Sequence, residues 1–340
     1  MRKINRFFTV ILSFAFIISA LGTANAGTFK REPKGDKQIK IGVMDLISAI
    51  EVAASFNKMY KKWAEARDWD IQVFDLGFDM TKAGPTMDNM ISAGYDGIII
   101  NWTAPAGYAP QLKRAYDAGI PVIIVAGDNM ADGMLANWVA WDSAMAGLTA
   151  EYLSGNLNPG SKILAYYNSA IPVAVKRFHI AQTVFKENKF EIVQALTPDT
   201  NKDPEVDAFE KVTNVLLADT NKEIKGIWAQ SDYMGIPAAR AALALNRKDI
   251  IVATADDTPR AYEALRTMPN VVGLAGYNGN VGPMLDGMFG MLEDAFAGKP
   301  IRTNQFIGLD VYLVTKETAP PKGYYYNPRG TGYDKRPKDF

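Results

Sequence analysis

The chain of 340 residues contains no cysteine and only one histidine, His179. Without cysteine it can form no disulfide, thiolate nucleophile, iron–sulfur cluster or cysteine-ligated zinc site. A single histidine is too few for the multi-histidine sites that usually hold catalytic zinc, and a Ser-His-Asp triad would have to use His179 itself. We therefore expect no metal site and no cofactor, and we interpret His179 as a structural or solvent-facing residue.

An excess of charge of one sign is also lacking, because 37 basic residues balance 37 acidic residues. Hydrophobic residues make up 48% of the chain and charged residues 22%, which is ordinary for a globular protein. This balance predicts neither a nucleic-acid-binding surface nor a disordered chain. The length is sufficient for two domains, each with its own core.

The one long apolar run lies at the N-terminus. Residues 1–26 begin with basic side chains, continue with an apolar run over 7–21 and end in Ala24-Asn25-Ala26, which is typical of a cleaved signal peptide. The run is shorter than the roughly 20 residues of a membrane anchor. Removing its three basic residues leaves 34 basic against 37 acidic residues, a net charge of about −3. Since no cysteine can carry a lipid, we predict a secreted protein of the periplasm that is not a lipoprotein.

Short apolar runs alternate with helical patterns over the rest of the chain. The runs over 98–100 and 122–125 are continuously apolar, as in strands covered on both faces. Two successive sets of such units predict an α/β protein with two doubly wound, Rossmann-like parallel-sheet domains. We expect a last strand over 306–314, and we interpret residues 319–340, rich in Pro, Gly and Tyr, as a surface tail.

Polar and aromatic residues follow most of the predicted strands, at the edge where sheets of this kind bind ligands. Carboxylates and amides bind hydroxyl groups and aromatic rings cover C–H faces, so this set favours a neutral polyhydroxylated ligand. The candidate ligand-binding residues are Glu51, Asn101, Trp102, Asp128, Asn129, Trp141, Arg177, Ser231, Asp232, Asp256, Tyr277 and Asn278.

Several of these residues also have a structural interpretation. Asp232 and Asp256 each precede a predicted helix and suit its N-cap. Glu51 suits the first turn of a helix, where an anion is favourable. Aromatic residues are more often part of a core than of a site, so Trp102 and Trp141 are open to both interpretations.

Five segments carry a resemblance to a known family: residues 39–43, 94–101, 118–122, 228–235 and 256–259. In order and spacing they resemble the ribose- and galactose-binding branch of the periplasmic sugar-binding proteins of ABC transporters, over about 39–314. The resemblance implies the type I periplasmic binding protein fold, with a hinge of three crossovers near Trp141-Asp142, Gly276-Tyr277 and Leu309-Asp310. The implied domains are residues 38–141 with 277–308 and residues 142–276 with 309–318.

Within this resemblance, Asn101 matches an asparagine of the family, Arg177 an arginine at the start of a long helix, and Asp256 the carboxylate of an Asp-x-Thr-Pro turn. Ser231 stands where the family commonly has asparagine. Three places depart from the family pattern. An aromatic pair is replaced over Ile50–Ala53, an Asp-Arg pair is replaced by Ala126-Gly127, and a polar residue at the hinge is replaced by Gly276. These departures argue against ribose as the ligand.

The resemblance implies a non-enzymatic, monomeric receptor that captures a small sugar or sugar alcohol between two closing domains and delivers it to an ABC transporter permease. One alternative is a sensor whose closed form is presented to a chemoreceptor or sensor kinase. A less favoured alternative is a glycoside-acting enzyme, which needs a carboxylate pair at fixed spacing. Repressors of the same fold carry an N-terminal DNA-binding helix-turn-helix where this chain has its predicted signal peptide, so we expect no nucleic-acid partner.

Overall fold

The computed structural model describes residues 27–35, 37–127, 129–199, 201–277, 281–327 and 332–335. The predicted signal peptide and the candidate residues Asp128 and Asn278 lie outside these described residues. Within them, no helix has both the length and the apolar character needed to cross a membrane.

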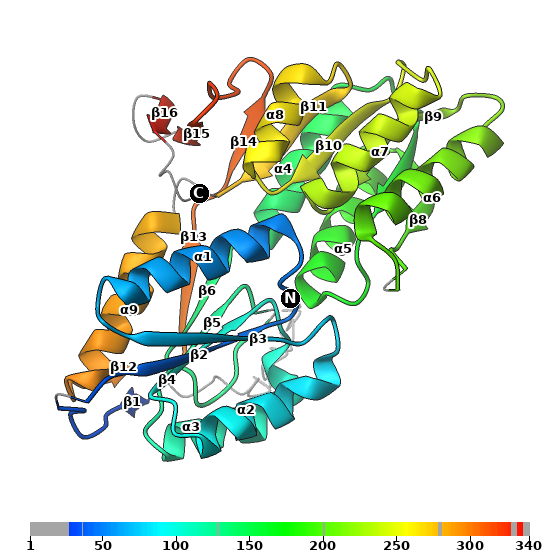
Figure 1. Ribbon diagram of the computed structural model, residues 1–340. Helices are drawn as coiled ribbons and strands as arrows, with labels where there is room; N and C mark the ends of the chain where they lie inside the picture. The colour runs from blue at the N-terminus through cyan, green and yellow to red at the C-terminus, as the bar shows by residue number, and fades with distance from the viewer. Residues whose placement is uncertain are drawn as a thin grey trace, which may run out of the picture.

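The first sheet has six strands in the order β13-β6-β5-β4-β2-β3, and all its neighbouring strands are parallel (Figure 1). Its strands are β2 (Lys40–Asp45), β3 (Asp70–Asp75), β4 (Gly97–Asn101), β5 (Val122–Val125), β6 (Ala136–Ala140) and β13 (Gln305–Leu309). Its helices are α1 (Glu51–Glu65), α2 (Ala83–Ser92), α3 (Ala109–Asp117) and α9 (Val281–Phe296), with short 3-10 turns at Met80–Lys82 and Pro105–Tyr108. We call this part the N-terminal domain.

The apolar run of β4 shows why both faces of this sheet are covered. Ile99 packs into the core beneath α1 and α9, whereas Ile98 and Ile100 pack into the core beneath α2 and α3. Successive side chains of a strand point to opposite faces, so a run without polar residues needs helices on both sides.

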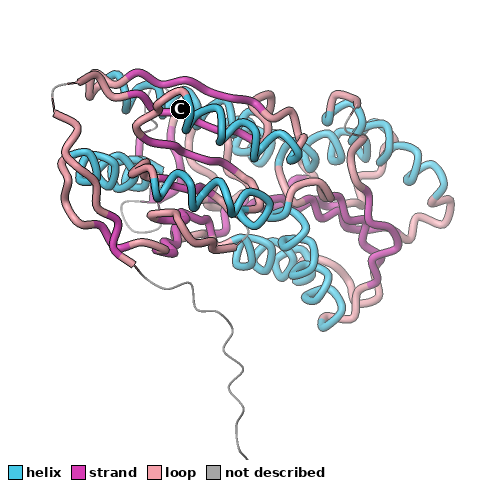
Figure 2. The backbone as a smooth tube through the Cα atoms, turned by 90° about the horizontal axis from the view of Figure 1, so that it is seen from below, coloured by secondary structure: helices cyan, strands magenta, loops and turns pink. Residues whose placement is uncertain are grey.

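The second sheet also has six strands, in the order β14-β11-β10-β9-β7-β8. Its strands are β7 (Lys162–Tyr166), β8 (Glu191–Leu196), β9 (Ile224–Ala229), β10 (Ile251–Ala255), β11 (Val271–Gly276) and β14 (Tyr312–Thr315), of which only β14 is antiparallel to its neighbour. Helices α4 (Asp142–Gly155) and α5 (Pro172–Glu187) cover one face, and α6 (Pro204–Ala218), α7 (Asp232–Ala244) and α8 (Pro259–Thr267) cover the other. We call this part the C-terminal domain. Figure 2 shows helices flanking the strands in both halves, and the predicted doubly wound α/β class is confirmed.

Three connections cross between the two domains. They lead from β6 to α4, from β11 to α9 and from β13 to β14. The single strand expected over 306–314 is therefore wrong, because β13 and β14 belong to different sheets and are separated at residues 310–311. Leu309 ends β13 in the N-terminal domain, one residue beyond the predicted boundary, and the predicted domain limits otherwise stay a proposal.

The ends of the described chain form two small two-stranded sheets. Strand β1 (Thr28–Phe29) pairs with β12 (Ile301–Arg302), and β15 (Tyr324–Asn327) pairs with β16 (Gly332–Lys335). The backbone N–H of Tyr326 donates to the Tyr262 hydroxyl at 3.1 Å, and its ring contacts that of Tyr312. The C-terminal segment, interpreted from sequence as a surface tail, thus packs in part against the core of the C-terminal domain.

Candidate functional site

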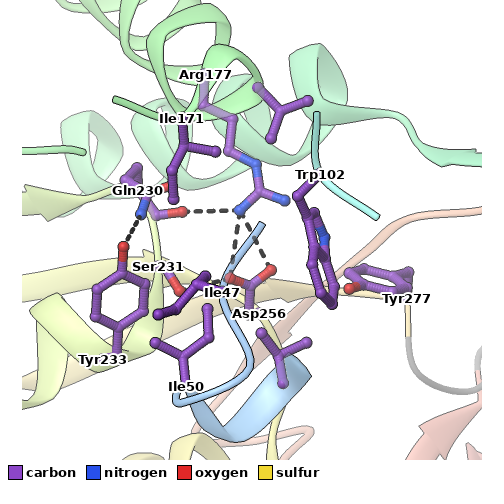
Figure 3. A pocket seen from close by; sticks show the side chains of 12 residues that line it. Ile47, Ile50, Trp102, Ile171, Arg177, Gln230, Ser231, Tyr233, Asp256 and Tyr277 are labelled. Carbon is purple, nitrogen blue, oxygen red and sulfur yellow. Dashed lines mark hydrogen bonds and ion pairs between the residues drawn. The ribbon is translucent and has the colours of Figure 1, made fainter. Parts of the chain in front are cut away.

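A pocket lies between the two domains, at the carboxyl ends of strands from both sheets (Figure 3). Its cavity volume is about 40 Å³. The N-terminal domain contributes Ile47, Ile50, Val52 and Trp102, and the crossover after β11 contributes Tyr277. The C-terminal domain contributes Ile171, Val173, Arg177, Gln230, Ser231, Tyr233 and Asp256.

Arg177, in α5, is the centre of a buried ionic network. Its Nε donates to Asp142 Oδ1 at 2.7 Å, and its Nη1 donates to both oxygens of Asp256, at 3.2 and 3.4 Å. Nη1 also donates to the Gln230 carbonyl oxygen at 2.9 Å. Burial by itself would lower the pKa of Arg177, but the two carboxylates outweigh it and raise the pKa, so the guanidinium stays charged.

Asp256 receives a second donor from the same domain. The Ser231 hydroxyl donates to Asp256 Oδ2 at 2.6 Å, so the carboxylate is bonded both to Arg177 and to a hydroxyl. The backbone of Asp256 has φ +68°, as Trp102 has φ +54° after β4. Left-handed backbone at a non-glycine residue is costly and is often found at functional sites. In both residues it turns the chain directly at the end of a buried strand.

Asp232 is buried, and it is not among the residues that line the pocket. Burial raises its pKa to about 7, and the nearby Asp256 adds to this shift. Thr258 donates a hydrogen bond to its carboxylate, and Arg260 approaches it at 3.7 Å. Neither Asp232 nor Asp256 caps a helix, because the N-cap of α7 is Ser231 and the side chain of Thr258 caps α8. The N-cap interpretation of the two aspartates is wrong.

Asn101 and Asp45 lie side by side at the ends of β4 and β2, beneath the pocket. Asn101 Oδ1 accepts from the Tyr60 hydroxyl at 2.8 Å. Burial raises the pKa of Asp45 to about 6, although Asn57 and Ser48 donate to its Oδ2 at 2.6 and 2.9 Å. Both residues are fully buried, and Asn101 is not among the residues that line the pocket.

Five of the twelve candidate residues come together in the pocket: Trp102, Arg177, Ser231, Asp256 and Tyr277. Glu51 borders an adjoining cavity of about 350 Å³ and forms an ion pair with Arg260 at 3.3 Å across the domain boundary. Whether any of them binds a ligand stays a prediction.

Besides Glu51, Asn101 and Asp232, two more candidates do not line the pocket. Trp141 is 46% exposed and its ring packs against Phe306 instead. The backbone carbonyl of Asn129 accepts from Asn137 Nδ2 at 3.2 Å. Asn129 was a candidate because it follows the predicted strand over 122–125, and Trp141 because its ring could stack on a ligand near a predicted crossover. His179 is exposed on α5, as expected.

The aliphatic residues of the pocket, which include Ile47, Ile50 and Val52, were not predicted, because only polar and aromatic residues were considered as ligand-binding candidates. Gln230, which also lines the pocket, could have been predicted from the sequence because it directly follows β9. Among the described residues, no group of three or more metal-ligating side chains is close enough to hold a metal ion.

Asp257, next to Asp256, holds the crossover after β11. Its carboxylate accepts from the backbone N–H of Tyr277 at 3.0 Å and from the hydroxyls of Tyr262 and Tyr312, both at 2.7 Å. A Cβ at Gly276 would lie 2.1 Å from Asp257 Cγ. The space that a side chain at 276 would need is thus occupied by Asp257, which explains the third departure from the family pattern.

A family model described as "Periplasmic binding protein domain" matches residues 43–275. The chain belongs to the periplasmic binding protein family. Its curated relatives include the ribose import binding protein RbsB of Escherichia coli strain K12, 23% identical over 208 residues that cover 60% of this chain and 68% of the relative. The protein of the same name from Bacillus subtilis strain 168 is 22% identical over 264 residues, 76% of this chain and 83% of that one.

Solved structures of ABC transporter proteins share the fold. A sugar ABC transporter protein from Yersinia enterocolitica superposes with a TM-score of 0.76 at 18% identity, over 85% of this chain and 87% of that one. A solute-binding protein from Bacillus halodurans with bound myo-inositol superposes with a TM-score of 0.71 at 23% identity, over 84% and 97%. At these identities the likeness establishes the fold, and it confirms the predicted type I architecture.

Proposed function

We propose that this periplasmic binding protein captures a small sugar or sugar alcohol between its two domains and delivers it to the permease of an ABC importer. Relatives of this chain are named ribose import binding proteins, and proteins of the same fold are described with bound allitol, myo-inositol or arabinofuranose. The observation that carries the proposal is the cluster of Arg177, Asp256 and Ser231, which faces an interdomain pocket beside the rings of Trp102 and Tyr277.

The polar cluster suits the recognition of hydroxyl groups. Asp256 accepts hydrogen bonds and Arg177 donates them, so a hydroxyl that does both can bind to the two together. Because Asp142 and Gln230 hold Arg177 from behind, its guanidinium is already oriented before any ligand arrives. Ring faces of Trp102 and Tyr277 then cover C–H groups of the ligand.

Because both domains line the pocket, a bound ligand favours closure of the two domains. A ligand held by Asp256 in one domain gains contacts with Trp102 of the other domain only when the cleft is shut. It therefore binds the closed form more tightly and shifts the open–closed equilibrium toward it. The permease recognises the closed form, or, in the signalling alternative, a chemoreceptor or sensor kinase does.

The carboxylates of the network favour binding over glycoside chemistry. Paired catalytic carboxylates flank the scissile bond of a sugar from two sides. Here Asp142 and Asp256 both bind one guanidinium, that of Arg177. We accordingly propose that the ligand leaves the protein chemically unchanged, and that the protein acts as a periplasmic monomer after cleavage of residues 1–26.

The test is calorimetric titration of the purified protein with pentoses, hexoses and polyols, followed by mass spectrometry of the recovered ligand. We expect at least one of them to bind and to be recovered intact. Arg177→Met should abolish this binding, whereas the matched variant Arg114→Met, which alters an exposed arginine of α3, should retain it. Binding of an amino acid or nucleoside, with none of the sugars or polyols bound, would overturn the proposal.

A further inference from the structure

The two walls of the pocket differ in chemistry. All the charged groups of the lining, Arg177 and Asp256, belong to the C-terminal domain, which also contributes the Ser231 hydroxyl and the aliphatic side chains of Ile171 and Val173. The facing segment of the N-terminal domain presents Ile47, Ile50 and Val52, whose side chains neither donate nor accept hydrogen bonds. In Figure 3, Ile47 and Ile50 lie toward the bottom of the view, with Arg177 and Gln230 above them.

The position of Ile50 strengthens this contrast. Ile50 is the N-cap residue of α1 and forms no side-chain hydrogen bond to the helix, although Ser, Thr, Asp and Asn are the residues preferred there. Its side chain instead packs against the core of the C-terminal domain, across the cleft. An aliphatic residue thus stands where a polar one would stabilise the helix, and it forms part of the pocket wall.

A fully hydroxylated ligand does not match such a wall. Each hydroxyl that closes against Ile47, Ile50 or Val52 loses its hydrogen bonds to water and gains none from these side chains. A methyl or methylene group at the same place has no hydrogen bonds to lose, and its burial removes apolar surface from water. A ligand with a polar edge and an apolar edge therefore fits the two walls better than one that is polar all round.

We propose that the natural ligand is a deoxy or alkyl-substituted sugar, with its hydroxyls on Arg177, Asp256 and Ser231 and its apolar edge against Ile47, Ile50 and Val52. The inference rests on the proposed function and specifies the ligand class. Ile47, Ile50 and Tyr233 also border the adjoining cavity of about 350 Å³.

The first test compares matched ligands by calorimetry. The panel adds deoxy and alkyl-substituted sugars to their hydroxylated counterparts, such as L-rhamnose with L-mannose, L-fucose with L-galactose and 5-deoxyribose with D-ribose. In the pair that binds most tightly, we expect the deoxy or alkyl member to bind at least about tenfold more tightly, as one group in an apolar pocket typically discriminates. Equal or tighter binding of the hydroxylated member overturns this inference and leaves the proposed function standing. If no sugar or polyol of either kind binds, the proposed function itself fails.

The second test changes the wall. Val52→Thr replaces one methyl group of the side chain by a hydroxyl of similar size, which can donate and accept hydrogen bonds. It should shift the ratio of the two affinities toward the hydroxylated member by roughly tenfold. Val193→Thr, at an exposed valine of β8, is the matched control and should leave the ratio unchanged. Thermal unfolding of both variants checks that they fold, and an unchanged ratio in folded Val52→Thr contradicts the inference.

Discussion

The two domains are built on the same plan and carry different chemistry at the cleft. Their six strands follow the same relative order along the chain, and only the last strand differs, since β13 is parallel to its neighbour and β14 is antiparallel. The charged groups that line the pocket all belong to the C-terminal domain, whereas the N-terminal domain contributes three aliphatic side chains and the ring of Trp102. The fold determines where the strand ends meet, and the few residues that follow them determine what can be bound there.

Replacing Arg177, the cation at the centre of the network, should have the largest effect. It removes the positive charge that only the C-terminal side of the pocket carries. Arg177→Met leaves Asp142 and Asp256 buried without a counter-ion, so we expect the free energy of unfolding to fall by about 3–5 kcal/mol, measured in urea. Sugar binding should fall at the same time by more than about a hundredfold. In Arg114→Met an exposed pair with Asp88 is lost, and the change in unfolding free energy should stay below about 1 kcal/mol. Similar losses in both variants would contradict the role given to the network.

The buried carboxyl groups behind the two walls should respond to pH with different midpoints. Burial raises the pKa of Asp232 from 3.8 to about 7 and that of Asp45 to about 6. Each group binds its proton more tightly in the folded state, so its contribution to stability is complete below about pH 4 and is lost as the pH rises through the folded pKa. Between pH 5 and 8 the wild type should therefore lose about 3 kcal/mol relative to Asp232→Asn, at about 1.4 kcal/mol per pH unit.

The measurement is the free energy of unfolding across that range for the wild type, Asp232→Asn and Asp45→Asn. The wild type should also lose stability relative to Asp45→Asn as the pH rises. This loss should be smaller than the loss relative to Asp232→Asn, and it should be complete about one pH unit lower. A difference between wild type and Asp232→Asn that does not depend on pH would show that Asp232 is ionised throughout.

The glycines beside two crossovers should differ in how they tolerate a side chain. In Gly276→Ala the new Cβ meets the buried Asp257, which cannot move because it holds three donors, and we expect a loss of about 1–3 kcal/mol. In Gly308→Ala it meets the ring of Trp141, which is exposed and can move aside, so the loss should be smaller. Gly147→Ala, in open space on α4, should be neutral or stabilising. Thermal unfolding ranks the three, and the reverse order of the first two would contradict this account.

The smallest effect concerns the ion pair that joins the two domains. Glu51→Gln removes the contact with Arg260 Nε at 3.3 Å, a partly exposed pair worth at most about 1 kcal/mol. We expect sugar binding to weaken by up to about fivefold, and less at high salt. Glu205→Gln removes a partner of the same arginine within the C-terminal domain and should leave binding unchanged. Equal effects of the two variants would show that the pair does not favour closure.

Sequence reasoning found the architecture because continuous apolar runs and helical patterns are local signals. It missed β6, whose buried Asn137 interrupts the apolar pattern and bonds the backbone of Gly127 instead. It also joined β13 and β14 into one strand, because the exchange of sheets at residues 310–311 depends on the packing of two domains and not on local sequence.

For the site, the strand ends were predictable and the side-chain directions were not. Arg177 and Asp256 were identified through a family resemblance, and the structure brings them together over 79 positions of sequence. Trp141 turns away from the pocket although it follows β6 directly. Ile50 was noted in the sequence only as part of the stretch that replaces the family's aromatic pair, and its place in the pocket depends on how the two domains meet.

The carboxylate of Asp257 has a mechanical consequence. It is bonded to the crossover at Tyr277, to β14 through Tyr312 and to α8 through Tyr262, whose hydroxyl in turn accepts from Tyr326 in the C-terminal hairpin. A rotation about this crossover strains the hydrogen bond of Tyr277 to Asp257, and with it the series of bonds that extends to Tyr326 in β15. The stiffness of the hinge therefore depends in part on β15, which contains Tyr326, and a truncation that removes this strand would alter how easily the two domains part.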